Sequence, residues 1–171
     1  MDALRSRSLL DGTAVQVAAD DRVVACRAVQ TLAELAEHHR LRRLVFVTEQ
    51  GLFATDDRDE HDDDPATLHV LGFEGGEAGG TVRLFPTPTA TEPRLWKGDR
   101  LAVRTDHRHS GLGGPLVRRA VALAGAAGGS RMVAWVQIAN VRFFQHLGWT
   151  TVGEPELYVG QLHQQMSIGL P

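Results

Sequence analysis

Residues 101–123 read LAVRTDHRHSGLGGPLVRRAVAL. The first three residues are apolar and predict a short buried strand, whereas the last third has apolar residues at helical spacing. Between them lie Arg108 and the glycines Gly111, Gly113 and Gly114, so the glycines open the helix. Unpaired amides at a helix N-terminus bind phosphate, and glycine lets a ligand approach the backbone closely. This order of strand, loop and helix predicts a pyrophosphate-binding loop.

The spacing within this loop separates it from the commoner phosphate motifs. The pattern Arg108-x-x-Gly111-x-Gly113 has neither the Gly-Lys-Ser/Thr ending of a P-loop nor the Gly-x-Gly-x-x-Gly order of a dinucleotide-binding loop. It resembles motif A of the GNAT acyltransferases, Arg/Gln-x-x-Gly-x-Gly/Ala. The resemblance implies that the loop amides hold the pyrophosphate of acetyl-CoA.

A second motif follows further along the chain. The apolar run 132–137 predicts a strand, and residues 140–149, NVRFFQHLGW, resemble motif B of the same family. One position departs from the family's pattern, because Phe144 stands where many relatives have a tyrosine thought to protonate the departing CoA thiolate. Phenylalanine cannot donate a proton. Either another group or water is the acid, or the thiolate leaves without one.

The two motifs together imply a fold and a cofactor site. The fold class is α/β, with a GNAT-type mixed central sheet flanked by helices and two parallel strands that splay apart at the CoA site. The residues implied to bind the cofactor are Leu101, Ala102, Val103, Arg108, His109, Ser110, Gly111, Leu112, Gly113, Gly114, Asn140 and Phe143. The edge of 101–103 would pair with the pantetheine amides, and the amide of Val103 would polarise the thioester carbonyl.

The rest of the sequence predicts further elements of such a sheet. Thr31 and Glu34 have the spacing of a capping box that opens a helix to about Leu44. Period and composition predict strands at 22–29, 67–73 and 80–85.

The first half of the chain carries a narrower resemblance. The run from Arg43 through VFVTEQ at 45–50, and GTVRLFP at 80–86, are similar to a GNAT subgroup and to the acyl-homoserine-lactone synthases that share its fold. The C-terminal pattern Gly160-x-x-His163-x-x-Met166 also resembles this subgroup. The resemblance implies that these segments face the acyl acceptor.

Acyl transfer to an amine requires a base, because a protonated amine has no free lone pair. Glu49 is the first candidate, since it lies in a mostly apolar run where partial burial would raise the pKa of its carboxyl group. His163, in an otherwise uncharged C-terminal strand, is the second. The structural alternatives are a surface carboxylate and a hydrogen-bonded histidine.

Two arginines are candidates for binding the acceptor. Arg83 alternates with its apolar neighbours on a predicted strand and could hold an acceptor carboxylate through two hydrogen bonds. The alternative is a structural ion pair with the acidic loop. Arg43 has the same ambiguity, since such charges commonly lie on the solvent face of a helix.

Residues 56–64 read DDRDEHDDD and invite a metal interpretation. The run lacks the glycine and the terminal glutamate of a calcium loop, so we expect a solvated segment. The functional alternative is that some of these carboxylates attract a cationic amine to the acceptor entrance. The histidines His38, His39, His107, His109 and His146 have no recognised ligand spacing, and the sequence assigns no metal site.

The composition indicates one compact domain. The chain has 171 residues, 43% of them hydrophobic, and we expect an N-terminal tail at 1–20 and one acyltransferase domain at 21–171. A net charge of -3 gives no drive toward nucleic acid or anionic membrane. No window reaches the roughly 20 apolar residues of a membrane span, so we expect a cytoplasmic protein.

These observations predict an acetyl-CoA-dependent N-acetyltransferase that transfers an acyl group directly to an amine acceptor. One alternative is an enzyme like the acyl-homoserine-lactone synthases, which use S-adenosylmethionine. Another is a CoA-binding sensor or subunit without catalysis, for which Phe144 is the best support. Dimers are common in the resembled family, so the resemblance also allows a homodimer.

Overall fold

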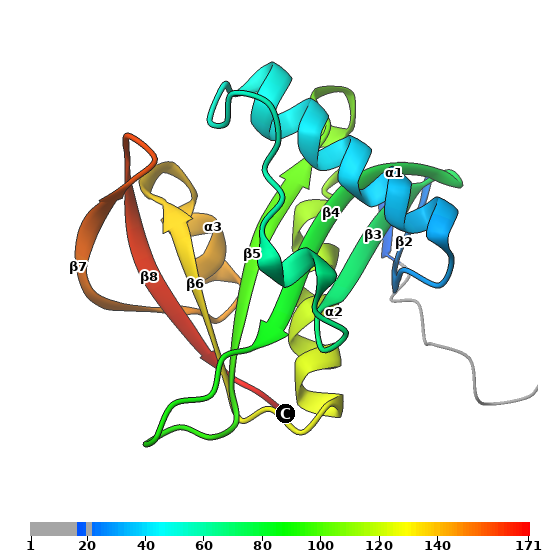
Figure 1. The fold of residues 1–171 in the computed structure, drawn as a ribbon. Coiled ribbons are helices and arrows are strands. Elements are labelled where there is room, and N and C mark those ends of the chain that lie inside the picture. Colours follow the sequence, from blue (N-terminus) through cyan, green and yellow to red (C-terminus); the bar gives the residue numbers. More distant parts are fainter. Residues whose placement is uncertain (1–16, 20–21) are drawn as a thin grey trace, which may run out of the picture.

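The computed structural model describes residues 17–19 and 22–171, which contain one eight-stranded sheet (Figure 1). Its strand order is β1-β2-β3-β4-β5-β6-β8-β7. The strands are β1 (Val17–Ala19), β2 (Arg22–Ala28), β3 (Leu68–Glu74), β4 (Glu77–Pro86), β5 (Leu95–Val103), β6 (Arg131–Gln137), β7 (Thr150–Tyr158) and β8 (Gln161–Gly169). All neighbours are antiparallel except β5 and β6, which are parallel. The predicted mixed sheet is confirmed.

Two long helices cover opposite faces of this sheet (Figure 1). Helix α1 (Leu32–Arg43) crosses β3 and β4 on one face, and a π-helical turn, Leu44–Glu49, continues it. Helix α2 (Gly113–Ala126) lies on the other face, and the short α3 (Val141–His146) connects β6 to β7. Three short 3-10 segments complete the helical structure of the described residues: Glu60–Asp63, Thr105–Ser110 and Ile138–Asn140.

The main core lies between α2 and the sheet. The apolar residues of α2 repeat at helical spacing, so one face of the helix is buried. The buried side chains on this face and in the residue before it are Leu112, Leu116, Val117, Ala120 and Ala124. A smaller cluster on the other side of the sheet joins Val45 and Phe46 to Ala102 of β5.

The predicted helix at 31–44 corresponds to α1, and its cap is as expected. The Oγ1 atom of Thr31 accepts a hydrogen bond from the Glu34 amide at 3.1 Å. The Glu34 carboxylate reaches back to accept a bond from the Gln30 amide at 2.8 Å, and it also pairs with Arg27. The bond to Thr31 satisfies an amide that the first helical turn leaves without a partner, and the bond from Gln30 fixes the residue before the cap.

Strands β2, β3, β4 and β6 confirm the predicted strands, with ends shifted by at most a few residues. Strand β5 begins at Leu95, earlier than the predicted 101–103. The sequence pattern missed its first half because Lys97 and Asp99 interrupt the apolar run. Strand β7 was not predicted, and all its residues are exposed, so no buried face marks it in the sequence. The predicted tail, 1–20, lies outside the described residues apart from 17–19, which pair with β2 as β1.

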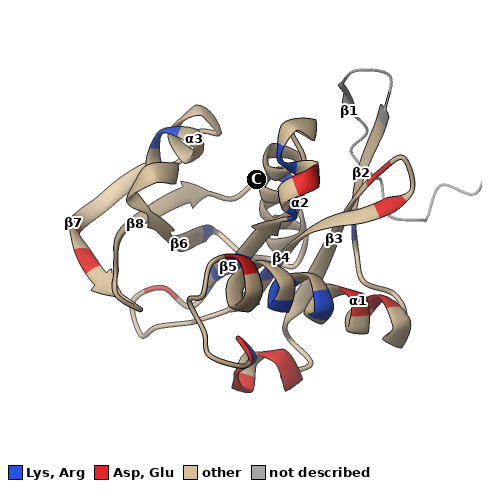
Figure 2. Cartoon of the chain, turned by 90° about the horizontal axis from the view of Figure 1, so that it is seen from above, with Lys and Arg blue, Asp and Glu red and all other residues tan. Residues whose placement is uncertain are grey.

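The acidic run 56–64 is only in part the expected solvated segment, because two of its carboxylates are buried. The side chains of Asp57 and Asp62 are fully buried and form ion pairs with the fully buried Arg42 of α1. Asp59 binds Arg83 of β4 through two hydrogen bonds, at 2.6 and 2.9 Å. A buried guanidinium is costly unless it is paired, and these carboxylates provide the pairing. Figure 2 shows the acidic segment close to α1 and β5.

None of the helices in the described part of the chain combines the length and the apolar character needed to cross a membrane.

Candidate functional site

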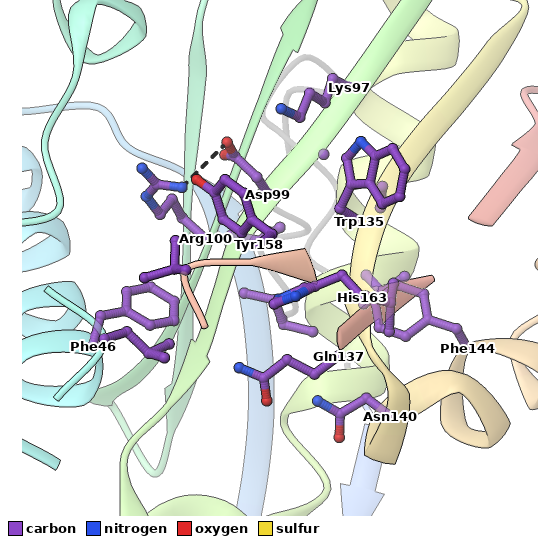
Figure 3. A pocket seen from close by; sticks show the side chains of 18 of the residues that line it. Phe46, Lys97, Asp99, Arg100, Trp135, Gln137, Asn140, Phe144, Tyr158 and His163 are labelled. Carbon is purple, nitrogen blue, oxygen red and sulfur yellow. Dashed lines mark ion pairs between the residues drawn. The ribbon is translucent and has the colours of Figure 1, made fainter. Parts of the chain in front are cut away.

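The parallel strands β5 and β6 separate soon after they begin. They pair only where Leu95–Lys97 face Arg131–Val133, and beyond this point the space between them is a cavity of about 410 Å³. Figure 3 shows side chains from both strands and from β7 and β8 around this cavity. The predicted splayed parallel strands are therefore confirmed, and a cavity of this size accommodates a small-molecule substrate.

The wall of the cavity formed by β5 contains a β-bulge. Thr81 pairs with Ala102 and Arg83 with Asp99, so Arg100 and Leu101 together face a single residue of β4. Arg100 has a φ of 52°, a conformation that is uncommon for a residue other than glycine. The Oγ1 atom of Thr81 donates a hydrogen bond to the Arg100 carbonyl at 3.0 Å. The bulge re-aims the backbone of β5 just where β6 has moved away.

The glycine-rich loop lies at the end of β5 and begins α2. Gly111 has a φ of 73°, which favours glycine, and no side chain caps the N-terminus of α2. A Cβ atom on Gly113 would stand 3.3 Å from the Cζ atom of Phe143. The loop therefore has accessible glycine backbone, and the predicted motif B residue Phe143 packs beside it.

A buried contact holds the first half of this loop. The Nδ1 atom of His107 lies 2.7 Å from the Glu74 carboxylate at the end of β3. The His107 ring also fills the space beside Gly79, where a Cβ atom would come within 2.7 Å of it. His107 therefore fixes the entry to the loop relative to the β3–β4 hairpin.

Arg108 and Glu49, which are distant in sequence, meet at this end of the sheet. The Arg108 guanidinium binds the Glu49 carboxylate at 2.8 Å and the Val103 carbonyl at 3.2 Å. Glu49 ends the π-helical turn after α1 and lies near the loop, while its neighbours Phe46 and Gln50 line the cavity. A π-turn inside a helix often marks a functional site.

The other candidate base, His163, lies in the cavity itself. It comes from β8, is 7% exposed, and its Nδ1 atom lies 3.0 Å from the Gln161 carbonyl. If Nδ1 carries the proton and donates it to this carbonyl, Nε2 keeps its lone pair. Asn140 and Leu101 also line the cavity, and Figure 3 shows Asn140 and His163 among the side chains around it.

The two arginines predicted for the acceptor have different surroundings. Arg83 is fully buried, and its guanidinium binds Asp59, Asp62 and Asp99. These contacts favour a structural ion pair with the acidic loop, and not binding of an acceptor carboxylate, as the role of Arg83. Arg43 is exposed at the end of α1.

Several cavity residues carried no signal in the sequence. Tyr158, the single tyrosine of the chain, lies at the end of β7 with its ring 5.4 Å from that of His163. Lys97, Asp99 and Glu156 also line the cavity. The positive φ of Arg100 and the β7–β8 hairpin, which bring some of these residues together, cannot be derived from local residue patterns.

Comparison with known proteins agrees with this geometry. The family described as Acetyltransferase (GNAT) family matches residues 32–149, from the start of α1 to the residue before β7. The chain belongs to the GNAT family. The match includes the glycine-rich loop, both splayed strands and the bulge of β5.

One related protein and two solved structures resemble the chain at low sequence identity. The uncharacterized N-acetyltransferase YjcF of Bacillus subtilis (strain 168) is 27% identical over 134 residues, which are 78% of this chain and 91% of that protein. The crystal structure of a protein from Lactobacillus plantarum has a TM-score of 0.74 at 22% identity, and the match covers 86% of this chain and 99% of that one. The CoA-dependent acyl-homoserine lactone synthase BjaI, solved with SAM and isopentyl-CoA, has a TM-score of 0.67 at 22% identity, and the match covers 82% of this chain and 78% of that one.

Proposed function

We propose that this GNAT protein is an N-acetyltransferase that transfers the acetyl group of acetyl-CoA directly to an amine acceptor. The observation that carries the proposal is the cavity between β5 and β6, which Asn140 and Phe144 line on either side of Phe143, the residue that packs beside Gly113 at the uncapped start of α2. An acetyl-CoA molecule lying along β5 would have its pyrophosphate at the loop and its acetyl group at the cavity.

Donor binding would use backbone more than side chains. The amides of residues 110–114 would bind the pyrophosphate, because the first turn of a helix has free N–H groups and the positive end of the helix dipole. Arg108 would add positive charge, and Asn140 and Phe143 would contact the CoA arm. The edge of β5 that β6 leaves unpaired would pair with the pantetheine amides, and the amide of Val103 would polarise the thioester carbonyl.

The reaction itself needs one proton removed from the amine and one supplied to the thiolate. His163 is our candidate base, because it lines the cavity and its Nδ1 atom is placed to donate to a carbonyl. We assign Glu49 to holding Arg108 at the loop, since its carboxylate is bound to that guanidinium. Phe144 is buried against Trp149 and cannot act as the acid. A thiolate is a tolerable leaving group near neutral pH.

The proposal is tested by calorimetric titration with acetyl-CoA, followed by a thiol-release screen against amines grouped by charge. We expect one binding site per chain and thiol release with at least one class of amine. Failure to bind acetyl-CoA would overturn the proposal.

Two other outcomes identify the alternatives. Binding without thiol release from any amine identifies a CoA-binding sensor or subunit. The fold similarity to the CoA-dependent synthase BjaI, solved with SAM and isopentyl-CoA, favours including S-adenosylmethionine as an acceptor, and the donors tested should include longer acyl-CoA as well as acyl-carrier protein. Transfer that requires S-adenosylmethionine as the acceptor identifies an acyl-homoserine-lactone-type synthase instead.

A further inference from the structure

Three histidines meet where α1 packs on the sheet. His38 and His39 belong to α1, and His69 belongs to β3, which α1 crosses in Figure 1. One ligand atom from each ring can be chosen so that all three lie within 4.8 Å of one another. Their ring centroids are 4.9, 5.7 and 5.9 Å apart. His69 is not among the five histidines whose spacing indicates no metal site in the sequence.

Each ring in this cluster has a buried nitrogen without a hydrogen-bond partner among the described residues. These atoms are Nδ1 of His38, Nε2 of His39 and Nδ1 of His69. Buried polar atoms are nearly always paired in folded proteins, so three unpaired nitrogens in one cluster need an explanation. A metal ion bound between the rings would give such nitrogens a partner.

The remaining contacts prepare the rings to be ligands. The Nε2 atom of His38 lies 3.2 Å from the Val82 carbonyl, and donation to this oxygen leaves a lone pair on Nδ1. Such an outer hydrogen bond to a carbonyl is the usual support of a metal-binding histidine. Burial lowers the pKa of His38 well below its ordinary value, and that of His69 to about 4. Neutral imidazole is the form that binds metal.

The geometry and the charge around the cluster suit a divalent cation. Imidazoles that share one zinc ion at about 2.0–2.1 Å have ring centroids roughly 5 Å apart, and movements of roughly 1 Å would bring these nitrogens to tetrahedral positions. The Oδ1 atom of Asp62 lies 3.6 Å from Nε2 of His39, so a carboxylate faces the cluster. Arg42 also lies near, but Asp57 and Asp62 neutralise it.

We infer that His38, His39 and His69 form a binding site for a zinc-class divalent ion that joins α1 to β3. Three imidazoles favour zinc, copper or nickel over calcium or magnesium, which prefer oxygen ligands. The side chain of His39 is 17% exposed, so the cluster lies close to the surface. Because two of the ligands lie on α1 and one on β3, the ion stabilises the packing of the helix on the sheet.

The test uses the full chain without an affinity tag, freed of metal by a chelator and then titrated with Zn²⁺ alone. We expect one tightly bound zinc per chain, measured by calorimetry and by elemental analysis after dialysis. We also expect the melting temperature to rise by about 5–10 °C when free zinc exceeds Kd by about 100-fold. Absence of a stoichiometric site, or no rise in melting temperature, would overturn the inference.

Variants assign the binding to these residues. His69→Asn and His39→Asn are each expected to weaken zinc binding at least about 10-fold, as loss of even an outer contact of a metal site does. Both residues are only partly buried, so both variants should fold without metal, as circular dichroism will show. His146→Asn is the control, because His146 is exposed on α3 and bonds only to the Arg142 carbonyl. Equal zinc affinity in all three variants would show that the metal binds elsewhere.

Discussion

At the scale of single residues, we expect the buried charges around Arg42 and Arg83 to matter most for the stability of the fold. Burial opposes the charged form of Asp62, but its hydrogen bonds to Arg42 and the nearby Arg83 outweigh this and hold its pKa well below the ordinary value. The carboxylates of Asp57 and Asp59 complete the pairing. Asp57 and Asp62 are therefore part of the folded interior, and they anchor the segment between α1 and β3.

Replacing Asp62 by asparagine should destabilise the fold strongly. The change leaves two buried guanidinium groups short of a partner, and we expect a loss of about 3–5 kcal/mol in the free energy of unfolding. Urea denaturation with a chelator present measures this loss without any contribution from metal.

The neighbouring residue provides a matched control for this variant. The side chain of Asp63 is 82% exposed, and Asp63→Asn should change stability by no more than about 0.5 kcal/mol.

The pH dependence of the free energy of unfolding gives a second check on the role of Asp62. Because the folded-state pKa of Asp62 is lowered, its contribution is complete above about pH 4 and is lost as the pH falls further. The Asp62→Asn variant should therefore lose less stability than the wild type on acidification. Similar losses for Asp62→Asn and Asp63→Asn would contradict this account.

Kinetics of two variants separate the candidate bases. His163→Gln should lower kcat by about 10²–10⁴-fold with little change in KM for acetyl-CoA, since it removes a proton acceptor from the cavity. Glu49→Gln should raise KM for acetyl-CoA several-fold and leave kcat nearly unchanged, because it weakens the hold on Arg108. The opposite pattern, with kcat lost only in Glu49→Gln, would assign the base to Glu49.

At the scale of elements, the loop from the end of β5 to the start of α2 is held from two sides. His107 binds Glu74 on the β3–β4 hairpin, and Phe143 of α3 packs against Gly113. These contacts fix the glycine backbone before any ligand arrives, and a preformed loop loses less conformational entropy on binding.

A side chain on Gly113 should obstruct this loop. Gly113→Val would place methyl groups against Phe143 and over the amides, so we expect acetyl-CoA to bind at least about 10-fold more weakly, or roughly 1.4 kcal/mol. Calorimetry measures the change. Gly169→Val, at an open position at the end of β8, is the control and should bind as the wild type does. Equal affinities in both variants would exclude the loop as the pyrophosphate site.

The elements also show what the sequence could and could not predict. Local signals identified β2, β3, β4, β6, α1 and α2, because each has either a cap or a periodic apolar face. The exposed strand β7 lacked both, and Asp57 and Asp62 resembled a solvated segment because their ion-pair partners lie 15 or more residues away. The approach of His69 to His38 depends on how α1 crosses the sheet, and no spacing along the chain encodes it.

At the scale of the whole molecule, the candidate site adjoins the main core. The core lies between α2 and the sheet, and its residues Val117, Met132 and Phe144 also line the cavity where the sheet opens between β5 and β6. The strands can part because the core beneath α2 joins side chains from both halves of the sheet, β2–β5 and β6–β8. The opening leaves polar backbone of β5 without a strand partner, which is the feature that a ligand with its own amides can use.

The most direct test of the central claim is amide hydrogen exchange in the presence and absence of acetyl-CoA. If the pantetheine amides of acetyl-CoA pair with β5 and its pyrophosphate binds the loop, the amides of residues 101–103 and 110–114 exchange more slowly in the complex. The exchange rates of amides in the distant β2 are unchanged. Binding of acetyl-CoA without added protection in either segment would contradict the proposed site.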